Sequence, residues 1–176
     1  MREAVRWLQQ GSGQPCRVPI GVIGTRRAKA AERQAAFALG AGLGALGLVL
    51  ICGGKGGVMA AACAGVAAAG GLSIGLLPDD EWAAANPHVG VPIATGIGVA
   101  RNAIIARAAL ALIAVGGGYG TLSEIAFGLQ FGRPVLALAG APPVAGVRSM
   151  ASPEAALDAV CRIVLALPES AAISAK

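Results

Sequence analysis

Residues 115–124, with the sequence V-G-G-G-Y-G-T-L-S-E, combine four glycines with a hydroxyl group and a carboxylate. They follow the apolar residues 109–114 and precede a second apolar segment, residues 125–131. This order predicts a strand, a glycine-rich turn and a helix. Glycine lets backbone N–H groups approach a ligand closely, and the positive end of a helix dipole attracts anions. The chemistry favoured here is therefore the binding of a phosphate by backbone amides.

A second glycine cluster, C-G-G-K-G-G at residues 52–57, also follows an apolar run and precedes an Ala-rich segment. A single cluster can serve only to tighten a turn or to let a helix pack closely, but two such turns together favour a ligand site. Neither has P-loop spacing, because Lys55 is followed by glycines, and no G-x-G-x-x-G follows the first apolar run. The turns therefore argue against ATP hydrolysis and dinucleotide oxidoreduction.

Three polar side chains near these turns each have more than one interpretation. Thr121 and Glu124 form T-x-x-E at a helix start, which is either a capping box or a phosphate ligand followed by a ribose ligand or catalytic acid/base. Arg101 lies among apolar neighbours, where a guanidinium needs an anion or an exit to water. It is either a surface residue or a partner of Glu124 or of a phosphate. The predicted ligand-binding residues are Gly53, Gly54, Lys55, Gly57, Thr95, Arg101, Asn102, Gly116, Gly117, Gly118, Tyr119, Gly120, Thr121 and Glu124.

The elements that position these residues are continuously apolar strands, each followed by a helical pattern. Such strands are typical of a parallel sheet that is covered on both faces, so we predict a doubly wound, Rossmann-like α/β fold. Ligands bind such folds at the carboxyl ends of the strands, where both glycine turns fall. We expect one domain over residues 17–176, preceded by a flexible arm over residues 1–16. The predicted strands cover residues 18–24, 48–52, 72–77, 89–94, 110–115 and 135–139.

The composition raises the question of a membrane protein. The mean hydropathy is +0.70, and residues 34–54 and 56–78 carry no charge. Both runs are rich in Gly and Ala, contain turn signals and lack an aromatic belt, so we expect no membrane span. No secretory signal precedes the four cysteines, which indicates reduced thiols in a cytoplasmic protein. With a single histidine and no paired cysteines, no metal site is predicted.

The positive charge is concentrated at the start of the chain. Residues 1–33 hold seven Lys or Arg against two Glu, which gives the whole net charge of +5, because the remaining residues balance. A basic segment suits a phosphorylated small molecule or nucleic acid. Nucleic-acid binding is the weakest of the functions considered, because aromatic platforms and a longer basic stripe are missing.

The motifs C-G-G-K-G-G-V-M, T-G-I-G-V-A-R-N and V-G-G-G-Y-G-T-L-S-E together resemble the Lonely Guy family, long mislabelled as lysine decarboxylases. The resemblance implies a Rossmann-like homo-oligomer, a dimer or a tetramer. It also implies a phosphoribohydrolase that releases the base from AMP or cytokinin nucleoside 5′-monophosphates. In that case residues 116–121 hold the phosphate, and Arg101 and Glu124 are catalytic.

Two departures favour a sister branch of this family. Val115 replaces a proline, and Arg101-Asn102 replaces Arg-Lys. The longer motifs are more similar to the molybdenum-cofactor carrier proteins, which bind the phosphate of the pterin cofactor at the same loop and catalyse nothing. We therefore expect non-catalytic binding of the molybdenum cofactor or an AMP-like nucleotide, with no cofactor required, and rank the hydrolase second.

Overall fold

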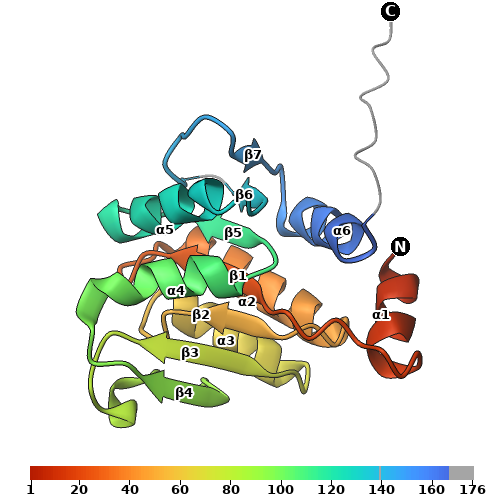
Figure 1. Ribbon diagram of the computed structural model, residues 1–176, viewed down its shortest axis with the longest axis horizontal. Coiled ribbons are helices and arrows are strands. Elements are labelled where there is room, and N and C mark those ends of the chain that lie inside the picture. Colours follow the sequence, from red (N-terminus) through yellow and green to blue (C-terminus); the bar gives the residue numbers. More distant parts are fainter. Residues whose placement is uncertain (139, 167–176) are drawn as a thin grey trace, which may run out of the picture.

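The computed structural model describes residues 1–138 and 140–166. Its strands form one parallel sheet of seven strands in the order β4-β3-β2-β1-β5-β6-β7, which confirms the predicted Rossmann-like α/β fold (Figure 1). The short last strand lies in a stretch that the sequence predicts as loop. The strands are β1 (Ile20–Gly24), β2 (Leu50–Cys52), β3 (Ser73–Leu77), β4 (Val91–Ala94), β5 (Leu112–Val115), β6 (Val135–Ala137) and β7 (Arg148–Ser149). Residue 139 of the last predicted strand and residues 167–176 of the predicted domain lie outside the described residues.

Helices cover both faces of the sheet (Figure 1). One face carries α2 (Ala30–Ala45), α3 (Val58–Ala68) and α6 (Pro153–Val164), and the other carries α4 (Arg101–Ala108) and α5 (Tyr119–Gln130). Each face has its own hydrophobic cluster, because both sides of every central strand are apolar. Two short 3₁₀ turns, η1 (Trp82–Ala84) and η2 (Gly98–Ala100), follow β3 and β4.

The abundance of Gly and Ala has a packing reason. A methyl group added at Gly40 of α2 would lie 2.0 Å from the carbonyl oxygen of Ala62, and one added at Gly65 of α3 would lie 2.1 Å from that of Phe37. The two helices therefore pack backbone against backbone, which larger side chains would prevent. In the described ranges no helix has both the length and the apolarity of a membrane span.

Residues 1–16, which the sequence suggested as a flexible arm, include a helix that packs on the domain. Residues Arg2–Gln10 form a helix, α1, whose Val5 is completely buried in the cluster that includes α2 and α6. The guanidinium of Arg2 donates to the carboxylate of Asp158 on α6 at 2.8 Å. The expectation of an arm was based on the charges of this segment and did not consider Val5, whose burial attaches the helix to the domain.

The order of the strands defines where a ligand can enter. After β1 the chain adds β2, β3 and β4 on one side, then crosses over to add β5, β6 and β7 on the other. The loops after β1 and β5 therefore diverge at their carboxyl ends. In open α/β sheets this switch point is the usual place of a ligand-binding crevice.

Candidate functional site

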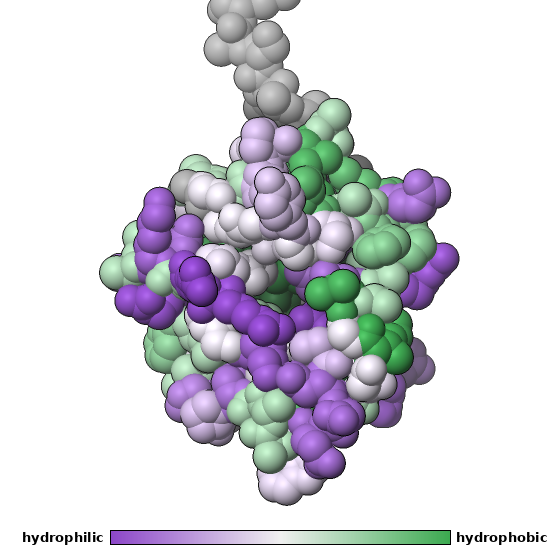
Figure 2. Space-filling model, turned by 90° about the vertical axis from the view of Figure 1, so that its left-hand side faces the viewer, coloured by the Kyte–Doolittle hydropathy of each residue, from purple (hydrophilic) through white to green (hydrophobic). Residues whose placement is uncertain are grey.

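A cavity of about 430 Å³ opens at this switch point, between the loop after β1 and the start of α5. In Figure 2, which faces the carboxyl-end edge of the sheet, a hollow is bordered by hydrophilic residues on one side and hydrophobic residues on the other. Six of the residues predicted from the sequence line it, namely Arg101, Asn102, Gly118, Gly120, Thr121 and Glu124. The cavity volume lies within the usual range of small-molecule sites.

The start of α5 corrects the interpretation of T-x-x-E as a capping box. The helix begins at Tyr119 with Gly118 as its N-cap, and no side chain caps it. Thr121 and Glu124 therefore lie inside the helix, too late to cap its first amides. Those amides have no partner within the helix, and the space beside Gly118 and Gly120 is open. This helix end is therefore suited to receive an anion.

The turn before α5 has a backbone that favours glycine. Gly116 and Gly117 have φ angles of +55° and +143°. A methyl group at Gly117 would lie 2.7 Å from Cβ of Thr121, whose buried side chain fills the inner side of the turn. The glycines thus shape the turn, while Thr121 packs against it. The side chain of Tyr119 is 93% exposed.

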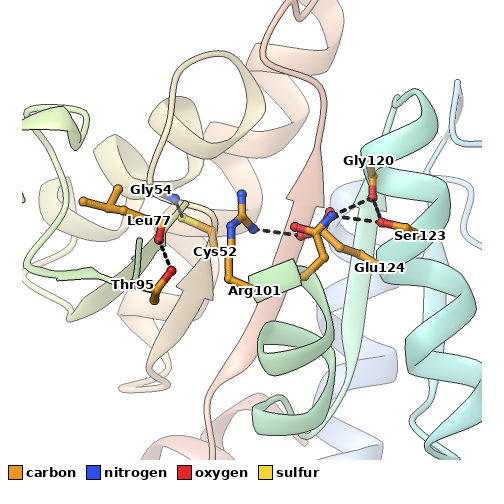
Figure 3. A network of polar contacts seen from close by, with 9 residues as sticks. Cys52, Gly54, Leu77, Thr95, Arg101, Gly120, Ser123 and Glu124 are labelled. Atoms are coloured by element: carbon orange, nitrogen blue, oxygen red, sulfur yellow. Dashed lines mark hydrogen bonds and ion pairs between the residues drawn. The ribbon is translucent and has the colours of Figure 1, made fainter. Parts of the chain in front are cut away.

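A buried ion pair forms the floor of the cavity. Nη1 of Arg101 donates to Oε1 of Glu124 at 3.3 Å, and both residues are 6% exposed. In Figure 3 the guanidinium lies between the β2 loop, with Cys52 and Gly54, and the carboxylate on α5. A methyl group at Gly53 would lie 2.3 Å from Nη2 of Arg101, so this glycine makes room for the guanidinium. Of the alternatives that the sequence left open for Arg101, a surface position is wrong and pairing with Glu124 is observed.

The electrostatics of this pair are set by burial. Desolvation raises the pKa of Glu124 to about 7, although the charge and hydrogen bond of Arg101 act against this rise. Desolvation also lowers the pKa of Arg101, and Glu124 opposes that effect. Nε of Arg101 is buried and has no hydrogen-bond partner within residues 1–138 and 140–166. The guanidinium therefore has donor capacity that Glu124 does not use.

Asn102 connects the helix that carries Arg101 to the start of α5. Its Nδ2 donates to Oγ of Ser123 at 2.9 Å and to the carbonyl oxygen of Gly120 at 3.4 Å. Oγ of Ser123 donates in turn to the same carbonyl at 2.7 Å. The first turn of α5 is thus held at a fixed distance from Arg101. The side chain of Asn102 acts as a brace between two elements of the cavity.

The second glycine cluster lies next to the cavity, but its lysine is directed elsewhere. Nζ of Lys55 donates to Oδ2 of Asp79 and to the carbonyl oxygen of Ala84, both at 2.8 Å. Its hydrogen bond also lowers the pKa of Asp79. Asn86 donates to the carbonyl oxygens of Gly54 and Lys55, so the residues after β3 are fastened to this cluster.

The remaining predicted residues have local roles. Gly57, with a φ of +68°, lets the start of α3 approach the carbonyl oxygen of Thr25, from which Val58 N–H is 3.0 Å away. The hydroxyl of Thr95 donates to the carbonyl oxygen of Leu77 at 2.7 Å. The predicted residues that do not line the cavity are Gly53, Gly54, Lys55, Gly57, Thr95, Gly116, Gly117 and Tyr119.

Sequence reasoning missed the contribution of the loop after β1. Arg26 and Arg27 line the cavity with exposed side chains, and the positive charge of Arg26 acts on Arg101. The available signal was a first strand that ends in glycine and is followed by two arginines. The missed lining residues are Gly24, Thr25, Arg26, Arg27, Met59 and Val99. In the described part of the chain no three His, Cys, Asp or Glu side chains cluster as metal ligands do.

The fold and this cavity define a class of protein, the Rossmann-like proteins whose site at the strand switch point combines an open helix N-terminus with a buried arginine. Residues 17–162 match the model of one family, the SLOG cluster4 family. This chain belongs to the SLOG cluster4 family. The match confirms the resemblance to the Lonely Guy superfamily.

Relatives at high coverage include one uncharacterized protein and two solved structures whose names refer to the molybdenum cofactor. An uncharacterized protein of Archaeoglobus fulgidus is 41% identical over 139 residues, which cover 79% of this chain and 91% of the relative. The molybdenum cofactor binding protein of Rippkaea orientalis is 34% identical with a TM-score of 0.79, covering 84% of this chain and 98% of that one. The molybdenum cofactor carrier protein of Chlamydomonas reinhardtii is 32% identical with a TM-score of 0.76, covering 85% and 99%.

Proposed function

We propose that this protein binds a phosphorylated, nucleotide-like small molecule without converting it, in the manner of a molybdenum-cofactor carrier. The observation that carries the proposal is the cavity at the switch point, where the uncapped start of α5 faces the buried Arg101. The similarity to a molybdenum cofactor binding protein and a carrier protein, each over nearly its full length, supports it.

The residues of the cavity fit the phosphate of such a cargo. The space on the side-chain side of Gly118 and Gly120 is open, and Nε of Arg101 lacks a hydrogen-bond partner among the described residues. Arg26 and Arg27 add two positive charges at the rim, against the single carboxylate of Glu124. In this proposal the helix start and Arg101 hold the phosphate, and the rest of the cargo extends toward the loop after β1.

The phosphoribohydrolase is the second candidate, and one observation favours it. Glu124 is 6% exposed, contacts Arg101 and has a pKa of about 7, which suits a general acid or base at neutral pH. In that reaction Glu124 acts at the ribose, while Arg101 stabilises the developing charge. The carrier ranks first because Asn102 stands where the resemblance implies a lysine in the hydrolases.

Incubation with nucleoside monophosphates separates the two candidates. We expect AMP to bind in competition with inorganic phosphate, and the purified molybdenum cofactor to bind more tightly than AMP. Neither AMP nor isopentenyladenosine monophosphate should release its base. Calorimetry measures the binding, and chromatography measures the free base. Base release that disappears in Glu124→Ala would overturn the carrier proposal. Absence of binding of AMP, isopentenyladenosine monophosphate and the molybdenum cofactor alike would overturn both candidates.

A homo-oligomer, a dimer or a tetramer, is part of the proposal. Large apolar side chains are exposed on η2, α4 and α5, which are packed beside one another, and such a surface suits association with a second copy. Val99 and Tyr119 are the most exposed, at 79% and 93%. The apolar residues exposed on these elements are Val99, Ile104, Tyr119, Leu122 and Phe127. The cytoplasmic location expected from the reduced cysteines also belongs to this proposal.

Substitutions that introduce negative charge on this apolar surface test whether it is the interface of a homo-oligomer. We expect Ile104→Glu combined with Phe127→Glu to convert the assembly into a monomer, because two like charges in an apolar interface lose hydration without gaining a partner. Light scattering after size-exclusion chromatography gives the molar mass. Trp82→Glu is the matched control, since Trp82 is 67% exposed and lies on η1, which is not one of these elements. A wild-type protein that is already monomeric contradicts the proposed oligomer.

A further inference from the structure

Two buried cysteines meet directly beneath the Arg101 side of the cavity. Cys52 ends β2 and Cys63 lies on α3, with their Sγ atoms 3.6 Å apart and both residues 0% exposed. A disulfide has an S–S length of about 2.05 Å, so the two sulfur atoms must approach by about 1.5 Å to bond. Rotation of the two short side chains can supply much of this movement. All four cysteines are free thiols.

The surroundings of this pair are more polar than those of an ordinary buried cysteine. The backbone N–H of Gly54 donates to Sγ of Cys52 at 3.3 Å. The hydrogen bond with Cys52 lowers the pKa of Cys63 to about 7, and hydrogen bonds with Ser73 and Asn86 act in the same direction. The shared hydrogen bond and burial raise the pKa of Cys52. Cys63 is therefore the more readily ionised thiol of the two.

The pair is also connected to the cavity through a single residue. Gly53 follows Cys52 in the chain, and the guanidinium of Arg101 lies directly against it. Figure 3 shows Arg101 beside the loop that carries Cys52 and Gly54. The charge of Arg101 is close enough to act on the thiol of Cys52. A displacement of Cys52 therefore moves the surface on which the guanidinium rests.

We propose that Cys52 and Cys63 form a reversible disulfide that weakens phosphate binding in the adjacent cavity. The proposal rests on the proposed function for its effect on binding, whereas the cross-link itself does not depend on that function. Drawing Cys52 toward α3 shifts Gly53 and, with it, Arg101. In a cytoplasmic protein a disulfide of this kind is transient and reports the redox state.

Hydrogen peroxide, a two-electron oxidant of small size, is the oxidant of the proposed step. The thiolate of Cys63 attacks one peroxide oxygen, the O–O bond breaks, and the departing oxygen takes a proton to leave as water. The sulfur of Cys52 then attacks the sulfenic acid on Cys63, the S–O bond breaks, and the proton of Cys52 leaves with that oxygen as a second water. Two thiols and one peroxide thus give one disulfide and two waters. A dithiol reverses the step by becoming a disulfide itself.

The experiment treats the reduced protein with hydrogen peroxide and then with dithiothreitol. Peptide mass spectrometry is expected to find the Cys52–Cys63 cross-link, and the free thiols should fall from four to two. The affinity for inorganic phosphate, measured by calorimetry, should drop by about fivefold or more and recover after reduction. Cys63→Ala should bind phosphate normally and lose the response to peroxide. Cys161→Ala is the matched control, because Cys161 is buried on α6 in the same cluster and should leave the response intact.

The outcomes that overturn the inference are separate from those that overturn the proposed function. If no cross-link between Cys52 and Cys63 forms while other thiols oxidise, the disulfide is wrong. If the cross-link forms and phosphate affinity stays unchanged, the regulation is wrong. If the reduced protein binds no phosphate, the proposed function is wrong, and the disulfide stands or fails on the mass spectrum. Cys63→Ser provides the same test if Cys63→Ala does not fold.

Discussion

Replacing Arg101 with glutamine is expected to weaken AMP binding about a hundredfold or more. Hydrogen bonds to charged groups contribute roughly 1.5–3 kcal/mol each, and each 1.4 kcal/mol changes affinity about tenfold. The guanidinium has a buried Nε without a partner and lies at the floor of the cavity, so its loss removes donors that glutamine cannot replace. Arg101→Lys should be intermediate, because an ammonium keeps the charge and loses the planar fork.

The matched control for this change is Arg107→Gln. Arg107 lies on the same helix, but its guanidinium stacks over the ring of Phe131, 3.9 Å from the ring centre, away from the cavity lining. Calorimetry with AMP compares the two variants with the wild-type protein. Equal affinities of Arg101→Gln and Arg107→Gln would remove Arg101 from the site.

The Arg101 variant should also stay folded, which makes its binding defect interpretable. Removing one partner of a buried ion pair usually lowers the stability of the fold by several kcal/mol, because the other charge is left unpaired in the protein interior. Glu124 escapes this penalty by taking up a proton, since burial already raises its pKa to about 7. At slightly acidic pH, thermal unfolding of Arg101→Gln should therefore resemble that of the wild-type protein.

The sheet could be predicted because its information is local. Each central strand is a short apolar run, and the burial of both faces follows from the absence of alternation. The glycine turns and Arg101 could be placed at the carboxyl edge for the same reason. The sequence of a single strand does not show which other strands lie beside it in the sheet. For this reason the contribution of Arg26 and Arg27 became visible only when β1 was found beside β5.

The start of α5 shows how tertiary contacts override a sequence pattern. Gly118, Tyr119 and Gly120 resemble turn residues, so the sequence predicts a helix that begins at Thr121. In the structure Asn102 binds the carbonyl oxygen of Gly120, and the helix begins earlier, at Tyr119. This shift of two residues removes Glu124 from the cap and places it beside Arg101.

The partner of Lys55 could not be foreseen for a related reason. Its ammonium binds Asp79, which lies 24 residues further along the chain and approaches only through the pairing of β2 with β3. A cation beside a glycine cluster suggests a phosphate ligand by composition alone. In the structure this charge instead fastens the residues after β3. The cations that line the cavity are Arg101, Arg26 and Arg27.

Replacing Glu124 with glutamine is expected to remove a pH dependence of stability on the order of 3 kcal/mol. The carboxyl has a pKa of about 7 in the folded protein, against an ordinary value of 4.5. Between these two pH values the carboxyl is therefore protonated in the folded protein and ionised in the unfolded protein. The stabilisation that this proton provides is complete below about pH 4.5. It is lost as the pH rises through about 7. Glu124→Gln cannot titrate, so its urea midpoint should change less over this range.

We expect the same proton to affect ligand binding, and its effect on binding can be measured separately from its effect on stability. Above about pH 7 the ionised Glu124 repels a phosphate and competes for Arg101, so AMP affinity of the wild-type protein should fall. The second ionisation of the phosphate, near pH 6, strengthens binding equally in both proteins. The ratio of the Glu124→Gln affinity to the wild-type affinity therefore isolates the carboxylate and should rise through about pH 7. A ratio that is independent of pH would show that no titration of Glu124 affects AMP binding over this range, and the expected role of its protonation would be wrong.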